Sequence, residues 1–510
     1  MPFDALYRQS LALLTDLYQL TMALGYWRAG RDRDDAIFHL FFRKNPFAGG
    51  YAVACGMEQV VEYVKGLRFE EADTSYLRTL TGHDGAPLFP NEFLSFLREM
   101  RFSCDIDAVP EGTVVFAQEP LIRVRGPLIE CQLLETALLN IVNFQTIIAT
   151  KAARICQAAA GDPVLEFGLR RAHGVDGALS ASRAAYIGGC AATSNVLAGK
   201  LFGIPVRGTH AHSWVMSFDD ELGAFEAYAE AMPNNCVFLV DTYDTLAGVE
   251  HAIEVGRRLR ERGFRLLGVR LDSGDLAWLS VKARELLDRA GFPDAAIVAS
   301  NDLDERAIQS LKSQGAKIAV WGVGTKLVTA YDQPALGGVY KLAAIRKSGG
   351  EWEHKIKVSE QAVKTSTPGH LQIRRYSLGE EFVGDMVYDE LYGQECAAIV
   401  DVKDPTRCKW FANGTTSEDL LKPLFKGGRF VGEQPPIAHL RERVKDQLSR
   451  LHAGIRRFDN PHEYPVGLEP RLHELKTRLV FEARGIRPPR LLVTDDRPTK
   501  AATEPSAPRP

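Results

Sequence analysis

Short apolar runs alternate with helical patterns through the middle of the chain. Strands are predicted where a few apolar residues stand together between breaks, and helices where apolar residues recur with a period of 3.6. In chain order the predictions are strand 164–167, helix 178–202, strand 204–206, a helix near 221, strand 236–240, helix 245–262, strand 266–271, helix 276–290, strand 296–299, helix 304–313 and strand 318–320. Strands that alternate with helices indicate βα units and a parallel sheet.

Polar residues follow each of these strands directly. The segments are 166–170 (EFGLR), 209–212 (THAH), 241–244 (DTYD), 270–275 (RLDSGD), 300–302 (SND) and 322–325 (GVGT). The carboxyl ends of parallel strands meet at one face, so polar groups after every strand favour a (β/α) barrel with its active site there. An open doubly wound sheet would concentrate them at one switch point. We therefore predict an α/β fold built on a (β/α) barrel, complete or incomplete.

The chain on either side of this region has a different pattern of predicted helices and strands. Before it, the pattern predicts helix 11–29, strand 37–42, helix 57–65, two short strands between 109 and 125, and the longest helix of the chain over 130–160. After it, a charged hairpin is predicted over 339–346 and 351–358, then further strands to about 432 and a helix over 440–451. These elements indicate an α+β domain built from the N-terminal and post-barrel segments.

Four segments are therefore expected. An N-terminal α+β domain (1–129) precedes the barrel-like catalytic core (130–338). A strand-rich segment followed by helices (339–485) packs with the N-terminal domain, and the Pro-rich tail (486–510) is expected to be disordered. A chain of 510 residues exceeds one compact core, which agrees with several domains.

Composition excludes several classes of protein. Hydrophobic residues at 45% and charged residues at 25% are the balance of an ordinary globular protein, and a net charge of -3 offers no basic surface for nucleic acid or an anionic membrane. The N-terminus lacks a secretory pattern, and no window reaches the ~18 apolar residues of a membrane span. Eight cysteines without a C-x-x-C pair are expected to be reduced thiols. We expect a cytoplasmic protein without nucleic-acid or membrane partners.

Two histidines spaced i, i+2 stand at the end of one predicted strand, in the segment 206–214 (VRGTHAHSW). His210 and His212 are either a metal-ligating pair or one working histidine with a packed neighbour. A metal pair of this kind, as in metal-dependent amidohydrolases, requires further histidines at later strand ends. The sequence has none between His251 and His354, which disfavours the metal site.

Other strand ends offer groups that bind phosphate. Glycine amides at 322–324 and the Thr325 hydroxyl suit an anion, although turns use glycine widely. Arg270 and Asp272 form either a structural salt bridge or an anion contact beside a Mg2+ ligand. These residues predict an enzyme that acts on a phosphorylated, Mg2+-bound small molecule.

These segments together resemble the nicotinate phosphoribosyltransferase family. The matching segments are 14–19 (LTDLYQ), 140–146 (NIVNFQT), 166–171 (EFGLRR), 208–213 (GTHAHS), 270–275 (RLDSGD), 322–325 (GVGT) and 336–340 (LGGVY), within a likeness from about 10 to about 480. The resemblance implies a type II phosphoribosyltransferase fold, a homodimer with shared active sites, and Mg2+. It also implies synthesis of nicotinate mononucleotide and pyrophosphate from nicotinate and phosphoribosyl pyrophosphate, with ATP as a co-substrate that is hydrolysed.

By motif position, the resemblance implies a pocket for the pyridine ring. Tyr18, reaching across the dimer, and Phe167 would hold the ring between them. Arg270 would bind the nicotinate carboxylate or an adjacent phosphate, and Thr209 would line the same pocket. Arg170 would contact phosphate.

The resemblance also implies sites for the phosphates and for ATP. Gly322, Gly324 and Thr325 would hold the 5'-phosphate. Asp272 would help order the ribose and Mg2+, and His212 would be the histidine that ATP phosphorylates. A phosphorylated histidine would add negative charge beside the diphosphate site.

One further position is implied to separate acid from amide substrates. Similar enzymes that use nicotinamide place an aspartate where Asn195 aligns, within the predicted helix 178–202. A carboxylate there would repel the carboxylate of nicotinate, so Asn195 fits the acid. His210 would pack or orient its neighbour.

Overall fold

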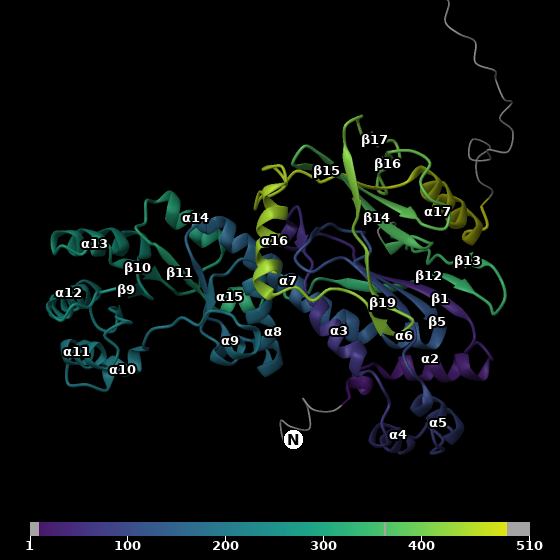
Figure 1. The fold of residues 1–510 in the computed structure, drawn as a ribbon, viewed down its shortest axis with the longest axis horizontal. Coiled ribbons are helices and arrows are strands. Elements are labelled where there is room, and N and C mark those ends of the chain that lie inside the picture. Colours follow the sequence, from purple (N-terminus) through teal and green to yellow (C-terminus); the bar gives the residue numbers. More distant parts are fainter. Residues whose placement is uncertain (1–9, 362–363, 487–510) are drawn as a thin grey trace, which may run out of the picture.

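The computed structural model describes residues 10–361 and 364–486. A parallel sheet with its helices lies at one end of the molecule, two largely antiparallel sheets lie at the other, and the long helix α7 (Glu135–Ala159) runs between them (Figure 1). The prediction of a disordered tail from 486 onward falls almost wholly outside the described residues. No helix in the described part of the chain is long and apolar enough to cross a membrane.

The parallel sheet has six strands in the order β7-β6-β11-β10-β9-β8. They are β6 (Val164–Glu166), β7 (Ala192–Thr193), β8 (Val237–Leu239), β9 (Gly268–Leu271), β10 (Ala296–Ala299) and β11 (Val320–Val323). Every neighbouring pair is parallel, and one further bridge joins Thr193 to Val206. Since β7 and β8 stay at opposite ends of this order, the structure confirms an α/β fold on an incomplete barrel.

Helices follow the strands as predicted. They are α8 (Gly174–Ile187), α9 (Val196–Phe202), α10 (His212–Met216), α11 (Glu221–Ala231), α12 (Thr245–Glu261), α13 (Leu276–Arg289), α14 (Glu305–Ser313) and α15 (Thr325–Val328). Aspartates begin four of them by accepting a hydrogen bond from a backbone N–H of the first turn: Asp220, Asp244, Asp275 and Asp304. The polar residues that end one strand therefore also start the next helix.

The single helix predicted over 178–202 is wrong. The chain turns at Gly188 and Gly189, forms β7, and restarts as α9 with Asn195 as its N-cap. A side chain at Gly188 would stand 2.4 Å from the carbonyl oxygen of Ala149 on α7, and Gly189 has a φ of +125°. The helix therefore ends at a glycine pair, in which Gly188 packs closely on α7 and Gly189 takes the positive φ that closes the last turn.

Smaller shifts occur elsewhere. Of the predicted strand 204–206, only Val206 pairs, and the strand predicted over 318–320 lies at β11 instead. The helix predicted over 11–29 is a short 3-10 turn (Leu11–Leu13) followed by α2 (Leu17–Arg28). The longest predicted helix divides into α6 (Leu128–Leu133) and α7.

The second sheet joins the two ends of the chain. Its order is β13 (Trp352–His354), β12 (Gly338–Arg346), β1 (Asp35–Phe42), β5 (Ile122–Pro127), β3 (Asp105–Ala108), β19 (Lys422–Lys426) and β20 (Arg429–Phe430). The predicted hairpin is confirmed, because β12 and β13 pair antiparallel. This sheet is the α+β part that the sequence predicted from N-terminal and post-barrel segments.

A third sheet and the remaining helices complete the fold. The sheet is β17 (Cys408–Trp410), β16 (Ala398–Val400), β21 (Val466–Leu468), β15 (Glu381–Asp389), β14 (Leu371–Leu378) and β18 (Thr416–Asp419), and β2 (Ala52–Val53) pairs with β4 (Val114–Val115). The helices are α3 (Met57–Gly66), α4 (Glu71–Arg78), α5 (Asn91–Glu99), α16 (Ile437–Ser449) and α17 (Pro470–Ala483). One large hydrophobic core runs from the second sheet through α7 into the barrel, so the barrel has a rigid support.

Candidate active site

Arg270 is the centre of the charged cluster at the carboxyl ends of β8, β9 and β10. Its Nη1 donates to Thr209 Oγ1 at 3.2 Å, and its Nε donates to Ser300 Oγ at 2.8 Å. Its Nη2 lies 3.1 Å from Asp272 Oδ1, and the side chain is 14% exposed. These contacts hold the guanidinium in one orientation while leaving part of it open to a ligand.

His212 lies between two carboxylates. It is the first residue of α10, and its Nδ1 is 3.1 Å from Thr242 Oγ1. Its Nε2 stands 3.9 Å from Asp272 Oδ2 and 4.0 Å from Asp241 Oδ1, with 40% of the side chain exposed. The contact of Nδ1 with Thr242 therefore holds the ring in place, and the Nε2 edge remains accessible.

Asp241 belongs to the polar segment 241–244 after β8, for which the sequence predicted no role. Its Oδ2 accepts from the Asp272 N–H at 2.8 Å and from Ser273 Oγ at 2.6 Å. Its Oδ1 is buried and has no hydrogen-bond partner among the described residues. A buried carboxylate oxygen without a donor is costly unless a ligand or ion completes it. Its position just after β8 is the sequence signal that could have identified it as a site residue.

His210 has a different environment from His212. Its ring packs against Phe225, Tyr228 and Phe238 at centroid distances of 5.9, 5.0 and 6.3 Å. Its Nε2 accepts from the Leu239 N–H at 3.2 Å, and burial lowers the pKa of His210 to about 4. Among the described residues, no group of three or more His, Cys, Asp or Glu side chains could hold a metal ion. The Nε2 of His210 is therefore occupied by the Leu239 N–H, whereas that of His212 faces two carboxylates.

The Phe167 ring packs against Gly322 of the neighbouring strand β11. The Phe167 N–H donates to Val323 O at 2.8 Å, and the Arg270 guanidinium lies 5.7 Å from the ring centroid. A Cβ at Gly322 would stand 2.7 Å from the ring. Glycine at this position in β11 therefore makes the room that the Phe167 ring occupies.

Gly324 and Thr325 stand at the carboxyl end of β11, where the phosphate site is predicted. Gly324 precedes the short helix α15, and Thr325 is its first residue. The next side chain, Lys326, is paired with Asp304 at 2.7 Å. Arg170 is exposed on the 3-10 turn Leu169–Arg171 that follows Phe167. The structure thus gathers these residues at one face, while their contacts with ligands stay predictions.

Of the two remaining predicted site residues, Tyr18 lies apart from this face, whereas Asn195 closely follows β7 at the carboxyl end of the sheet. Tyr18 is 47% exposed on α2, where burial and then Glu135 raise its pKa. Asn195 is buried, donates from Nδ2 to Ser182 Oγ at 3.2 Å, and accepts from the Ala198 N–H at 3.2 Å. The amide of Asn195 is therefore engaged inside the protein. Its predicted role in selecting the carboxylate of nicotinate remains a hypothesis.

Known proteins match this sequence along most of its length. Family models for nicotinate phosphoribosyltransferase match as its N-terminal domain over 13–143, its family region over 163–376 and its C-terminal domain over 373–476. Nicotinate phosphoribosyltransferase of Bacillus subtilis is 47% identical over 486 residues, covering 93% of this chain and 97% of the relative. The human enzyme of that name is 36% identical, covering 92% and 96%.

Solved structures lead to the same family. The crystal structure of human nicotinic acid phosphoribosyltransferase superimposes with a TM-score of 0.78 at 34% identity, covering 91% of this chain and 99% of that chain. Nicotinate-nucleotide pyrophosphorylase from Pyrococcus furiosus shares the fold, with a TM-score of 0.65 at 22% identity and coverage of 86% and 96%. The chain belongs to the nicotinate phosphoribosyltransferase family, enzymes of NAD biosynthesis.

Proposed function

We propose that this chain makes nicotinate mononucleotide and pyrophosphate from nicotinate and phosphoribosyl pyrophosphate, and that ATP hydrolysis is coupled to the reaction through His212. One observation carries the coupling: the His212 Nε2 is accessible and lies beside two carboxylates, whereas His210 is packed. Only one of the two histidines can therefore meet a phosphoryl donor.

The transfer itself requires orientation more than acid–base catalysis. The pyridine nitrogen forms a bond to ribose C1 as the bond from C1 to the pyrophosphate oxygen breaks, through an oxocarbenium-like state. The nitrogen lone pair is already a nucleophile. Phe167 would support the ring, and Arg270, next to Thr209, would hold its carboxylate.

The carboxylates of Asp241 and Asp272 fit a magnesium ion whose remaining ligands would come from the substrate. Mg2+ takes oxygen ligands and commonly uses one or two carboxylates together with substrate phosphates. The unpartnered Asp241 Oδ1 and the nearby Asp272 carboxylate, 30% exposed, supply such oxygens. Bound Mg2+ would neutralise charge on the departing pyrophosphate. Gly322 in β11, with Gly324 and Thr325 directly after the strand, would hold the 5'-phosphate.

Phosphorylation of His212 would change how strongly this site binds the magnesium ion. The Nε2 would form a bond to the γ-phosphorus of ATP as the bond to the ADP oxygen breaks. The new dianion would stand close to Asp241 and Asp272, so binding of a cation and its diphosphate ligand becomes linked to the state of His212. Hydrolysis of the phosphohistidine resets the site.

We also infer a homodimer with shared sites and a cytoplasmic location. The exposed apolar side chains Leu17, Tyr18 and Met22 share α2, with exposures of 52%, 47% and 41%. Such a cluster suits burial against a second copy, from which Tyr18 would reach the pyridine pocket.

One assay tests the proposal. Nicotinate mononucleotide is measured with and without ATP for the unsubstituted chain, His212→Ala and His210→Ala, with nicotinamide in place of nicotinate as the substrate control. We expect turnover of nicotinate over nicotinamide, stimulation by ATP, and loss of that stimulation only in His212→Ala. Equal loss in both variants would contradict the assignment of His212.

A further inference from the structure

The Glu166 carboxylate holds the turn that carries Phe167. Glu166 is the last residue of β6 and is 1% exposed. One of its oxygens accepts from the N–H of Gly168, two residues ahead. The other accepts from Ser182 Oγ at 2.8 Å and Thr193 Oγ1 at 2.5 Å. The side chain thus spans Phe167 and fixes the backbone that follows it.

Asn195 adds a second layer to this network. Its Nδ2 donates to Ser182 Oγ at 3.2 Å, and its backbone N–H donates to Thr193 Oγ1 at 3.0 Å. Both hydroxyls can therefore donate to Glu166 while accepting from Asn195. Helix α8, through Ser182, and strand β7, through Thr193, therefore meet on the carboxylate at the end of β6, and the start of α9 supports both hydroxyls.

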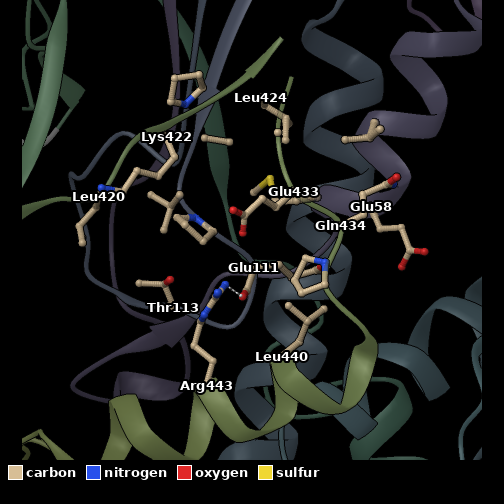
Figure 2. Close-up of a pocket in the computed structure, with 18 of the residues that line it drawn as sticks. Glu58, Glu111, Thr113, Leu420, Lys422, Leu424, Glu433, Gln434, Leu440 and Arg443 are labelled. Atoms are coloured by element: carbon tan, nitrogen blue, oxygen red, sulfur yellow. Dashed lines mark hydrogen bonds between the residues drawn. The ribbon is translucent and has the colours of Figure 1, made fainter. Parts of the chain in front are cut away.

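Helix α8 is also held from its other side. Arg183, the neighbour of Ser182, is fully buried and pairs with Glu111 through two bonds of 2.7 and 2.8 Å. It also contacts Glu58 at 2.6 Å. These residues line a cavity of about 610 Å³ beside α3 and α16, where Figure 2 labels Glu58 and Glu111. The ion pairs fix α8, so Ser182 meets Glu166 from a rigid element.

We propose that Glu166 is a positioning residue for nicotinate, with Ser182 as its main support from α8. The inference rests on the proposed contact between Phe167 and the pyridine ring. A ring platform is useful only in one orientation, and the Glu166 bonds set the backbone direction on both sides of Phe167. Phosphoribosyl pyrophosphate would be held mainly by the ends of β9 and β11, with Arg170 on the following 3-10 turn as one further phosphate contact, so its binding depends less on this turn.

Two variants and one matched control test the proposal. Glu166→Gln keeps the shape but presents an amide NH2 to donors that require an acceptor. Ser182→Ala removes a single hydroxyl. Ser280→Ala is the control, because Ser280 is equally buried on a helix, donating to Ala277 O at 2.9 Å and accepting from the Lys317 N–H at 3.0 Å, away from Phe167.

Steady-state kinetics with each substrate varied give the readout, together with the thermal midpoint of each variant. We expect the KM for nicotinate to rise about tenfold in both test variants, or about 1.4 kcal/mol, with less than about a twofold change for phosphoribosyl pyrophosphate. Ser280→Ala should lower the midpoint but leave both KM values unchanged. Ser182→Ala keeps the test open if Glu166→Gln fails to fold.

The remaining outcomes are also decisive. Equal rises in both KM values, or the same rise in Ser280→Ala, would reduce Glu166 to a purely structural residue and overturn the proposal. Failure of the unsubstituted chain to use nicotinate would overturn the proposed function and this inference with it. Turnover of nicotinate without the KM split would overturn only the inference.

Discussion

The substitution Gly322→Ala tests how the ring platform is built. The added methyl would stand 2.7 Å from one carbon of the Phe167 ring and 2.8 Å from another. Ordinary contact begins at about 3.4 Å, so the ring or the strand must move by at least about 0.7 Å. The site limits such movement, since the Phe167 N–H is bonded to Val323 and Glu166 holds the next residue.

A displacement of about 1 Å can lower catalysis by about 100-fold. We therefore expect Gly322→Ala to lower kcat/KM for nicotinate roughly 10- to 100-fold, about 1.4–2.8 kcal/mol. Overpacking should also cost about 1–3 kcal/mol of folding stability. The assay is initial-rate kinetics at varied nicotinate, with thermal unfolding measured in parallel.

Gly66→Ala is the control for a glycine substitution, because a Cβ at Gly66 would meet nothing within 4 Å. It should leave both kinetics and stability nearly unchanged. If Gly322→Ala folds and keeps the kcat/KM of the unsubstituted chain for nicotinate, the Phe167 ring is not the platform for the pyridine, and the reasoning fails.

Two further predictions concern the charged cluster, and a third concerns the packed His210. Asp241→Asn should raise the Mg2+ concentration needed for half-maximal rate about tenfold or more by removing a carboxylate ligand, which Mg2+ titration of the rate measures. Arg270→Lys should lower kcat/KM for nicotinate by about 100-fold, because an ammonium cannot reproduce the bonds to Thr209, Ser300 and Asp272. An equal effect with a pyridine that lacks the carboxylate would argue against a contact between Arg270 and that carboxylate. The pKa of His210 near 4 lies below the ordinary 6.5, so its neutral form stabilises the fold above pH 6.5, and up to about 3 kcal/mol is lost as the pH falls from 6.5 to 4. Denaturant unfolding between pH 6.5 and 4 measures this loss of folding free energy for the unsubstituted chain and for His210→Gln. The part of the loss that comes from His210 should be absent in the variant.

The alternation of strands and helices was readable from the sequence because it rests on local patterns. Helices predicted over 245–262, 276–290 and 304–313 match α12, α13 and α14 within about a residue. Their starts are marked by aspartates that cap the first turn, and their apolar faces repeat with the helical period.

The break between α8 and α9 was not readable in the same way. The apolar pattern continues on both sides of the break, but the chain turns at Gly189, whose positive φ closes the last turn, while Gly188 packs closely on α7. The same break determines the position of Asn195. It becomes a buried cap whose amide reaches Ser182 rather than a residue in the middle of a helix.

The sequence by itself determined the order of βα units, the polar strand ends and the absence of further histidines for a metal pair at the His-x-His motif. Only the tertiary structure decided which histidine is accessible. The aromatic side chains of α11 and β8 enclose His210, whereas the neighbouring ends of β8 and β9 bring Asp241 and Asp272 to His212. Residues two apart in sequence differ in this way because burial and charge come from elements that are distant in the chain and meet only when the sheet forms.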